Sequence, residues 1–545
     1  MSLTHIATSG LLASQKALTV ASNNIANAET EGYSRQVVQF QPTYTLHPGV
    51  GALGTGINSS SVNRITSQFL TAQMWESQAI AGETKTHLSY LNDLDQWLGS
   101  DNMSLAKGFD NFFTALNGGA VDPVESSTRQ VILAESNGLT GRFNTLFNQL
   151  QGQAEVVGQQ LNAAANQING LLTNIAGFND QLRTLSTGSQ PANEILDLRD
   201  QAVKDLSELV SVNVLQHDNG SYSVYMKSGQ PLVLGNQHNS LSVEGLVDAA
   251  DGFQMILQTG NTKIRVTGDP GGTVGGLLQY QSDQLVYARN EMGRMAVVLA
   301  HEINTQLQAG EDLNGNPGTS LFNDLTTPVG AAMPLDTVST AVTALTITDT
   351  SQLQSSDYDF RVDNAGNYRV VRRLDNTDVA AGVLSGTGTD TLTFDGIEVS
   401  VDATATDQAY RLAPLRYGAR EIQTMMSDPS ALAFAAPGNG IGDNSNLLDL
   451  VAIQSKGLIN GGTSTLVTAY SGFVGEVAVQ TSRSKTEAAG GQALLSQVES
   501  AVGTYSGVNL DEEAASILRF QQLYSANARV ISVARSTFDA LLAMF

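Results

Sequence analysis

The C-terminal segment of this 545-residue chain carries an apolar stripe that continues to its last residue. The stripe advances in steps of three and four residues, the spacing of one helix face. Its members are Ile517, Phe520, Tyr524, Ile531, Phe538, Leu541 and Phe545. A second stripe, Leu523, Ala526, Val530 and Val533, makes more than half of the circumference apolar. Because chain ends are normally polar and frayed, a terminal helix this apolar is expected to pack against more than one neighbour.

The N-terminal segment shows the same kind of periodicity between residues 3 and 25. Apolar or small residues recur at heptad-like spacing, namely Ala7, Leu11, Ser14, Leu18, Ala21 and Ile25. Pairing of the two terminal helices within one molecule is the simplest interpretation, but it leaves part of the C-terminal helix uncovered. We therefore predict that Leu11, Leu18 and Ile25 join the C-terminal stripe in packing between subunits, in a head-to-tail contact.

Between the ends, helical and strand-like patterns alternate in long blocks. The sequence predicts an α+β multidomain protein in which terminal helices form a coiled-coil-type core and β-rich modules are inserted into a helical bundle built from discontinuous segments. The predicted parts are terminal helices and an extended linker at 1–63 and 506–545; a helical body at 64–209, 269–335 and 416–505; a β-rich segment at 210–268; and an outer β domain at 336–415. Within the body, one helical stretch is expected from about 445 to 505.

Composition excludes several classes of function. Lys and Arg number 28 against 52 acids, for a net charge of −24, which argues against a nucleic-acid-binding surface. The chain has no cysteine, which excludes a disulfide framework, a thiol nucleophile and a Cys-ligated zinc site. The N-terminus lacks the pattern of a cleaved signal peptide, and no run of 18 apolar residues occurs, so no membrane partner is expected.

Catalytic and metal-binding motifs are incomplete wherever they begin. His301-Glu302 opens like a zinc-protease helix, but Thr305 stands where the second His is required. The stretch from Asp312 resembles a calcium loop, yet Pro317 replaces its glycine, so a polar turn is the better interpretation. We expect no catalytic residue, no metal ligand and no cofactor.

Glycines and paired acids in the middle of the chain have ordinary structural explanations. The cluster Gly271, Gly272, Gly275 and Gly276 lacks the Lys-Ser or Lys-Thr of a phosphate-binding loop and is interpreted as tight turns at a helix start. Pairs such as Asp197 and Asp200 are expected by chance in a chain with 52 acids.

A longer motif follows the N-terminal helix, from Ala21 to Arg35. Asn23, Asn24 and Asn27 can end the helix, Gly32 supplies a turn, and Tyr33 begins an extended segment. This stretch resembles the signature of bacterial flagellar rod, hook and hook-associated proteins, the axial family of the flagellum. The C-terminal stretches 507–514 and 518–528 resemble the C-terminal region of the same family.

Internal stretches narrow the resemblance to the hook-associated members at the hook–filament junction, although the resemblance is weak over 341–415. They lie around residues 122–130, 196–201, 229–233, 271–278 and 312–316. The resemblance implies a structural adaptor without catalysis that forms a junction ring of identical subunits between the hook protein and a second junction protein. It also implies export without a cleaved signal through the flagellar type III apparatus, an extracellular location after a transient cytoplasmic stage, and a cytosolic chaperone on the C-terminal helix.

Two alternatives remain at this point. The chain could be another flagellar axial protein, such as a hook or distal rod subunit, although the internal stretches and the long helical body argue against it. It could also be a secreted hydrolase with flagellar-type ends, which would need a catalytic constellation in 341–415, where only acids, Thr and Arg occur.

Overall fold

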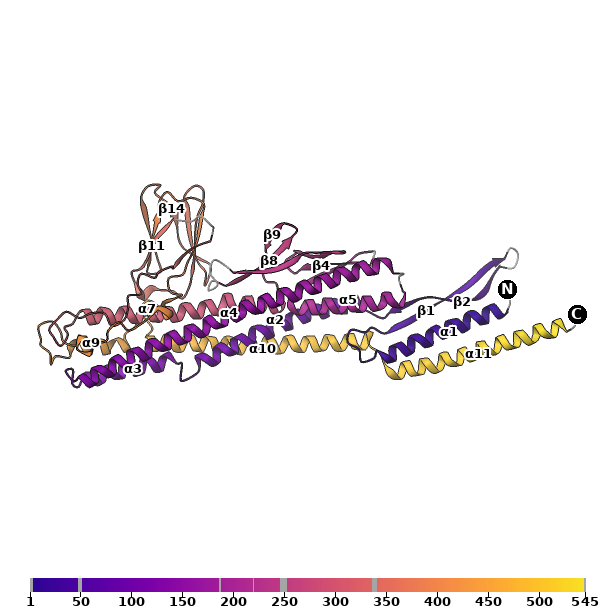
Figure 1. Cartoon of the computed structure of the whole chain (residues 1–545), viewed down its shortest axis with the longest axis horizontal. Coiled ribbons are helices and arrows are strands. Elements are labelled where there is room, and N and C mark those ends of the chain that lie inside the picture. Colours follow the sequence, from indigo (N-terminus) through magenta and orange to yellow (C-terminus); the bar gives the residue numbers. More distant parts are fainter. Residues whose placement is uncertain are drawn as a thin grey trace.

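The computed structural model describes residues 3–47, 51–185, 188–218, 220–245, 252–335 and 341–543. The molecule is elongated, with both termini at one end (Figure 1). We call the part at that end the terminal unit and the long bundle beside it the helical body. Two β-rich parts rise from one side of the body, and we call them the inner β module and the outer β module.

The terminal unit consists of two antiparallel helices and a β ribbon. Helix α1 (Leu3–Ala26) packs against α11 (Leu510–Leu542), and β1 (Gln36–His47) pairs with β2 (Gly51–Arg64) in an antiparallel ribbon beside α1. Its core is small and separate from the main core of the protein: it comprises Ala17, Val20, Val38 and Val62, with Phe520 packed against them. The terminal unit therefore has little hydrophobic burial of its own.

The helical body combines segments that lie far apart in the sequence. Its helices are α2 (Gln68–Leu98), α3 (Leu105–Gly119), α4 (Ser126–Thr184), α5 (Gln190–Leu209), α6 (Gly272–Gln279), α7 (Val286–Gln308), α8 (Gly418–Glu421), α9 (Ser445–Ala452) and α10 (Leu466–Ser506). A π-helical turn, η1 (Tyr280–Leu285), joins α6 to α7. Helix α4 has 59 residues and is about 90 Å long at 1.5 Å per residue. Helix α10 returns along α2, so the C-terminal part of the chain completes the bundle that α2 begins.

Local sequence explains where several of these helices begin. The hydroxyls of Ser67, Ser104 and Thr465 each accept a hydrogen bond from the first turn of α2, α3 and α10. Gly271 and Gly272 have positive φ at the start of α6, which confirms a tight turn there, whereas Gly275 and Gly276 lie inside the helix.

The two β modules are antiparallel throughout. The inner β module contains β3 (Val212–Gln216), β4 (Tyr222–Met226), β5 (Pro231–Leu234) and β6 (Gln237–His238) in one sheet, and β7 (Ser240–Gly245), β8 (Phe253–Thr259) and β9 (Thr262–Arg265) in another. The outer β module has a sheet of order β10-β17-β12-β13-β14 and a second of order β11-β16-β15. These strands are β10 (Ala332–Pro334), β11 (Val342–Ile347), β12 (Tyr358–Val362), β13 (Asn367–Arg372), β14 (Thr377–Val383), β15 (Thr389–Phe394), β16 (Ile397–Asp402) and β17 (Gln408–Leu412). The α+β multidomain fold class is confirmed.

The helix expected from about 445 to 505 is interrupted, so that prediction was wrong in detail. Helix α9 ends at Ala452, a 3₁₀ turn η4 (Ile453–Ser455) follows, and α10 begins only at Leu466. Asn460, Gly461 and Gly462 lie between them at positive φ, a conformation that a helix does not use.

Candidate functional site

Helix α1 presents small residues to its neighbours, which lets α11 approach closely. A Cβ atom at Gly10 would lie 2.7 Å from the side-chain oxygen of Asn527 on α11. The buried positions of α1 are mainly Gly, Ala, Ser and Val. The predicted packing residues Leu11, Leu18 and Ile25 lie at the edge of this buried face and are only half buried.

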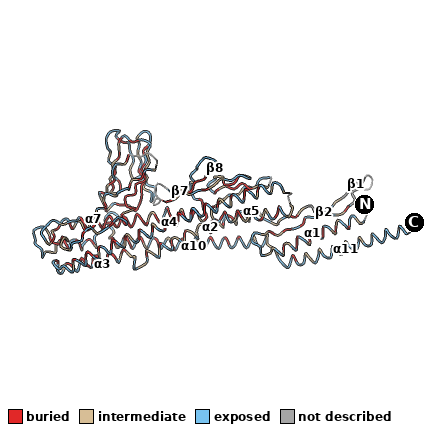
Figure 2. The backbone as a smooth tube through the Cα atoms, viewed as in Figure 1, coloured by how far each residue is buried: buried red, intermediate tan, exposed pale blue. Residues whose placement is uncertain are grey.

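Helix α11 is largely uncovered along its length (Figure 2). Of the predicted stripe, Ile517, Phe520 and Ile531 are half buried and Tyr524 is 37% exposed. Phe538 is 62% exposed. The side chain of Leu541 and the whole of Phe545 lie outside what the structure describes.

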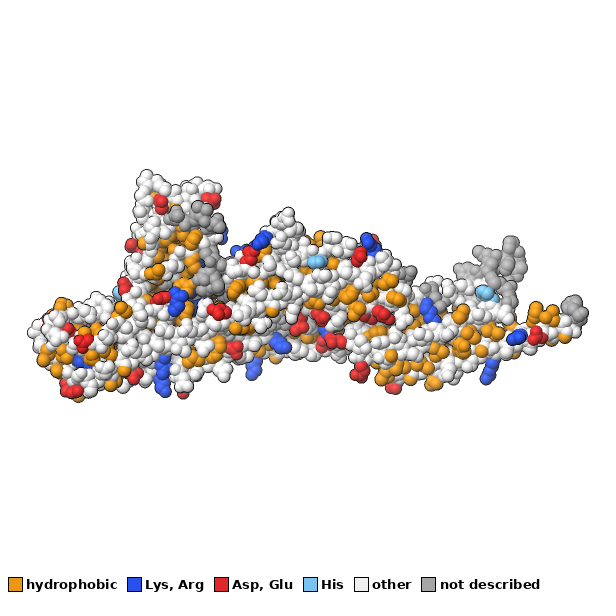
Figure 3. All heavy atoms as spheres, viewed as in Figure 1, with side chains coloured by type: hydrophobic (Ala, Val, Ile, Leu, Met, Phe, Trp, Pro, Cys, Tyr) orange, Lys and Arg blue, Asp and Glu red, His pale blue; other side chains and the backbone are white. Residues whose placement is uncertain are grey.

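The second stripe of α11 is also open. Leu523, Val530 and Val533 are all exposed, as are Leu518 and Leu542 outside that stripe. Apolar side chains accordingly gather on the surface of the terminal unit in Figure 3. The intramolecular pairing of the two helices thus covers only part of the apolar surface that the sequence displays.

The motif after α1 forms a compact network around Asn24. The Asn24 side chain accepts a hydrogen bond from Gln36 N (3.0 Å) and donates one to Gln36 O (2.9 Å), which holds the start of β1 against the end of α1. The Tyr33 hydroxyl donates to Asn24 Oδ1 at 2.8 Å. Burial, together with the negative charges of Asp197 and Glu513, raises the pKa of Tyr33 to about 12, so the hydroxyl stays protonated as a donor.

The other motif residues shape the turn that follows α1. Asn27 donates to the backbone and side-chain oxygens of Asn23 at 3.0 and 3.1 Å, which closes the end of α1. Gly32 has a φ of +79°, and a Cβ there would lie 2.9 Å from Oε1 of Gln201 on α5. The positive φ therefore favours glycine at this position, while the flexible end of the Gln201 side chain could move aside for a Cβ.

Arg35 links the motif to the C-terminal helix. Its guanidinium contacts Glu513 at 2.7 Å and Glu512 at 3.2 Å, at the acidic first turn of α11. Its backbone N–H donates to Ser506 O at the end of α10, at 2.9 Å. Arg35 thus contacts both the end of α10 and the start of α11. The N-terminal motif therefore positions the first turn of α11.

An ion-pair cluster on α5 attaches the terminal unit to the body. Arg64, at the end of β2, contacts Asp197 at 2.6 Å and Asp200 at 2.9 Å, and at most a fifth of each of these side chains is exposed. Burial opposes the charge of Arg64, but the two carboxylates outweigh it and raise its pKa above the usual value. We call the region around this cluster and Arg35 the joint.

The sequence interpretation missed the role of Asp197 and Asp200 by treating them as chance acids. Their carboxylates lie 133 and 136 positions from Arg64, so no local pattern links them. A usable signal was present, since both acids fall inside the internal stretch at residues 196–201 that resembled junction proteins.

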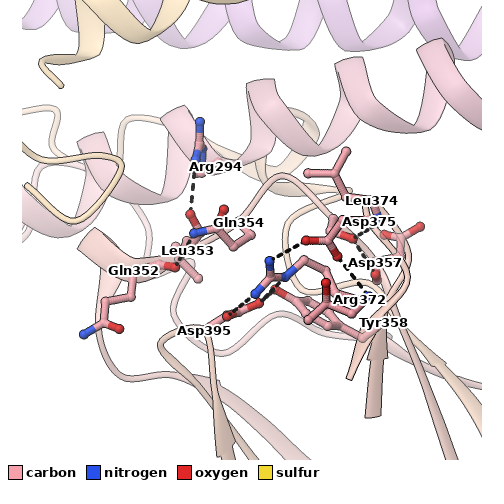
Figure 4. Close-up of polar contacts among 12 residues, drawn as sticks. Arg294, Gln352, Leu353, Gln354, Asp357, Tyr358, Arg372, Leu374, Asp375 and Asp395 are labelled. Atoms are coloured by element: carbon pink, nitrogen blue, oxygen red, sulfur yellow. Dashed lines mark hydrogen bonds and ion pairs between the residues drawn. The ribbon is translucent and has the colours of Figure 1, made fainter. Parts of the chain in front are cut away.

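The outer β module is attached to α7 by a polar cluster with buried charges. Asp357 forms an ion pair with Arg416, in which neither side chain is exposed, and accepts a hydrogen bond from Asn290 of α7 at 3.1 Å. Figure 4 shows the neighbouring contacts, including Arg294 Nη1 to Leu353 O at 3.1 Å. Because neither charge of the Asp357–Arg416 pair is exposed to water, separating the two side chains would be costly, and the pair holds the start of the module in place.

Within the described ranges, no three His, Asp or Glu side chains gather as a metal site, and no helix is long and apolar enough to cross a bilayer. The loop that begins at Asp312 is a closed polar turn, in which its Oδ1 accepts hydrogen bonds from the backbone N–H groups of Asn314 and Asn316, both at 2.8 Å.

Family models match several of these parts. The flagellar hook-associated protein FlgK helical domain matches residues 91–322, and the D2-like domain of flagellar hook-associated protein 1 matches residues 335–411. The flagella basal body rod protein matches residues 5–33, and the flagellar basal body rod FlgEFG protein C-terminal region matches residues 504–544. The family match over residues 335–411 corrects the expectation that the resemblance is weak in the outer β module.

Full-length relatives and a solved structure agree with these matches. Flagellar hook-associated protein 1 of Escherichia coli K12 is 32% identical and covers 99% of both chains, and the Bacillus subtilis protein of the same name is 23% identical over 98% of this chain and 96% of its own. The hook junction protein FlgK of Burkholderia pseudomallei shares the fold, with a TM-score of 0.72 and 23% identity over 79% of this chain and 99% of that one. The chain therefore belongs to the flagellar hook-associated protein 1 family.

Proposed function

We propose that this protein is a structural adaptor of the bacterial flagellum, located at the junction between hook and filament and needed for filament attachment. The observation that carries the proposal is the uncovered apolar surface of the paired terminal helices, in a chain whose full-length relatives are hook-associated proteins. The proposal includes no catalytic step, cofactor or metal.

The residues that drive assembly would be the apolar side chains of α11 that remain exposed in the single chain. Full burial of a large apolar side chain contributes roughly 1.5–3 kcal/mol. Phe538 and Leu542 are 62% and 60% exposed, so each would gain about 1–2 kcal/mol on assembly. Several such residues along α11 would supply enough free energy to hold the chain in a ring of identical subunits, with the hook protein on one side and a second junction protein on the other.

Charge distribution supports packing of the ends rather than of the modules. Residues 1–40 carry two basic and two acidic side chains, and residues 511–545 carry three arginines against four acids. Almost the whole net charge of −24 therefore lies between the two ends. Nearly neutral ends avoid like-charge repulsion when identical chains meet, whereas the acidic modules suit a surface that faces solvent.

We also propose export through the flagellar type III apparatus and capture of α11 by a cytosolic chaperone before export. The absence of cysteine suits passage of an unfolded chain, because no thiol can cross-link in transit. An amphipathic helix with an exposed apolar face is the kind of segment that a chaperone groove binds.

Electron microscopy of a strain lacking this chain tests the proposal. Hooks without filaments, with filament protein lost to the medium, are expected; normal filaments would contradict the junction role. A second strain expressing a chain without residues 515–545 is expected to fail in the same way while the truncated protein remains folded and loses chaperone binding. Unchanged motility of that strain would refute the assigned role of α11.

A further inference from the structure

The sequence contains seven Asn-Gly pairs, whose asparagines are Asn117, Asn137, Asn169, Asn219, Asn314, Asn439 and Asn460. In such a pair the backbone nitrogen of the glycine can attack the side-chain carbonyl carbon of the asparagine, because glycine has no Cβ to obstruct the approach. The attack needs a glycine N–H without a hydrogen-bond acceptor and a backbone that can bring the two atoms together. Asn219 lies outside the described residues, so the other six pairs can be compared.

Five of these six glycine amides are held in hydrogen bonds. Three pairs lie within α3 and α4, where helical geometry directs each backbone N–H to the carbonyl four residues earlier; their asparagines are Asn117, Asn137 and Asn169. In the turn after α7, Gly315 N donates to Asp312 O at 3.1 Å. Between α9 and α10, Gly461 N donates to Ser351 O at 2.9 Å. Each of these nitrogens would have to give up its hydrogen bond before it could react.

The pair Asn439-Gly440 differs from the others. It lies in an exposed loop, residues 437–442, that precedes α9, and the flanking Gly438 and Gly440 both have positive φ. Within the described ranges, Gly440 N–H donates to no acceptor. The Asn439 side chain makes a single long contact, from Nδ2 to Asp443 Oδ2 at 3.5 Å. Both reacting groups are therefore free in water, on a backbone that two glycines leave adaptable.

We propose that Asn439 is the site at which this chain undergoes spontaneous deamidation, with water as the only co-reactant. Hydroxide removes the proton of Gly440 N, and the nitrogen attacks Cγ of Asn439. The Cγ–Nδ2 bond then breaks, and Nδ2 takes up a proton from water and leaves as ammonia. Water opens the resulting cyclic imide at either carbonyl carbon, so the product is aspartate or isoaspartate and no atom is oxidised or reduced. Each event adds a negative charge to the loop.

The added charge falls beside the carboxylate that closes the loop. Asp443 Oδ2 accepts a hydrogen bond from Ala436 N at 2.7 Å and another from the Ser445 hydroxyl. These hydrogen bonds, that of Ser445 foremost, hold the pKa of Asp443 below its usual value, so the group is ionised at neutral pH. Deamidation of Asn439 replaces a donor by a second carboxylate, and like charges repel. Deamidation therefore loosens the loop that leads into α9, at the end of the body away from the termini (Figure 1).

Incubation of the purified full-length chain in mildly alkaline buffer over several days tests the site. Trypsin cleaves after Arg420 and Lys456, so the peptide of residues 421–456 carries Asn439 and no other Asn-Gly pair. Mass spectrometry with fragmentation measures the fraction in which an amide has become a carboxylate and locates the change. We expect the deamidated fraction at Asn439 to be at least tenfold that at Asn314 or at any other described pair.

The same chain unfolded in guanidinium chloride is the matched control. Unfolding releases the glycine amides from their hydrogen bonds, so the preference for Asn439 over Asn314 is expected to disappear. Equal rates at these two residues in the native chain would overturn the proposal. A preference for Asn439 that persists in the unfolded chain would overturn its structural basis, because the local sequence would then set the rate.

Two variants test the site and the effect on the loop. Asn439→Asp introduces the charge of the product, whereas Asn439→Gln keeps an amide but reacts far more slowly, because its longer side chain must close a larger ring. Asn439→Gln is expected to abolish the mass change in residues 421–456, and its persistence would assign the change to another amide and overturn the site. Hydrogen exchange at Ala436 N is expected to be at least threefold faster in Asn439→Asp than in Asn439→Gln. Equal exchange in the two variants would overturn the loosening of the loop.

Discussion

Removal of the Arg64 guanidinium would leave two carboxylates facing each other at the joint. The Arg64 side chain is 9% exposed, and those of Asp197 and Asp200 are 10% and 19% exposed. Breaking a buried ion pair by removing one partner costs about 3–5 kcal/mol. Because Asp200 retains some contact with water, we expect Arg64→Ala to destabilise the joint by about 3 kcal/mol, the lower end of this range.

Hydrogen exchange measured by mass spectrometry detects this loss of stability at the joint itself. The backbone N–H of Ser34 donates to Asp197, and that of Ile65 donates to Arg35 O. A loss of about 3 kcal/mol corresponds to roughly 100-fold faster exchange in peptides that cover these two amides. Exchange in the buried middle of α4 is expected to stay unchanged, because the terminal unit has a core separate from that of the body.

A control variant and a rescue variant test whether the loss of stability comes from the unpaired buried carboxylates. Lys263→Ala removes an ion pair with Glu244 whose two side chains are 62% and 40% exposed, so a cost below about 1 kcal/mol is expected. Adding Asp197→Asn and Asp200→Asn to Arg64→Ala is expected to recover part of the protection by removing the repulsion. Less than tenfold faster exchange in Arg64→Ala, or no recovery in the triple variant, would refute the reasoning.

Three further substitutions probe the terminal unit and the body. Phe520→Ala is expected to cost about 2 kcal/mol, because the ring is half buried, and faster exchange in α1 without a change in the melting temperature of the body would show it. Gly32→Ala is expected to cost about 1–2 kcal/mol at the joint, from the positive φ, and unchanged exchange at Tyr33 would contradict this. Burial and the charge of Asp269 raise the pKa of Glu83 from 4.5 to about 7; the folded chain therefore holds a proton that the unfolded chain releases, and stability falls as the pH rises from about 5 to 7. Glu83→Gln is expected to flatten that dependence in thermal melts, and an unchanged slope would refute it.

The terminal helices were the most predictable part of the fold. Their apolar positions recur at helical spacing over several turns, and that regularity is a property of the sequence itself. The prediction that one partner helix would leave α11 partly uncovered agrees with the exposure of Val533 and Phe538. The buried face of α1 was less clear, because its central positions are Gly, Ala and Ser, which carry little hydrophobic signal but permit close approach.

Long-range polar contacts could not be predicted from sequence patterns. The ion pairs of Arg64, at the end of β2, with Asp197 and Asp200 of α5 join residues that are distant along the chain, and so does the buried pair Asp357–Arg416. Their partners are set by the packing of whole elements, and a chain with 52 acids offers many equivalent candidates. The break between α9 and α10 is a different case, because Gly461 and Gly462 signal it locally and the apolar periodicity on both sides concealed it.

A reconstruction of the hook–filament boundary by cryo-electron microscopy tests the central claim most directly. It should contain a single ring of this chain at the boundary, with α1 and α11 packed against neighbouring copies and the outer β module away from the axis. Density for the chain elsewhere in the flagellum, or a boundary ring whose subunit contacts leave α11 exposed to solvent, would contradict the account.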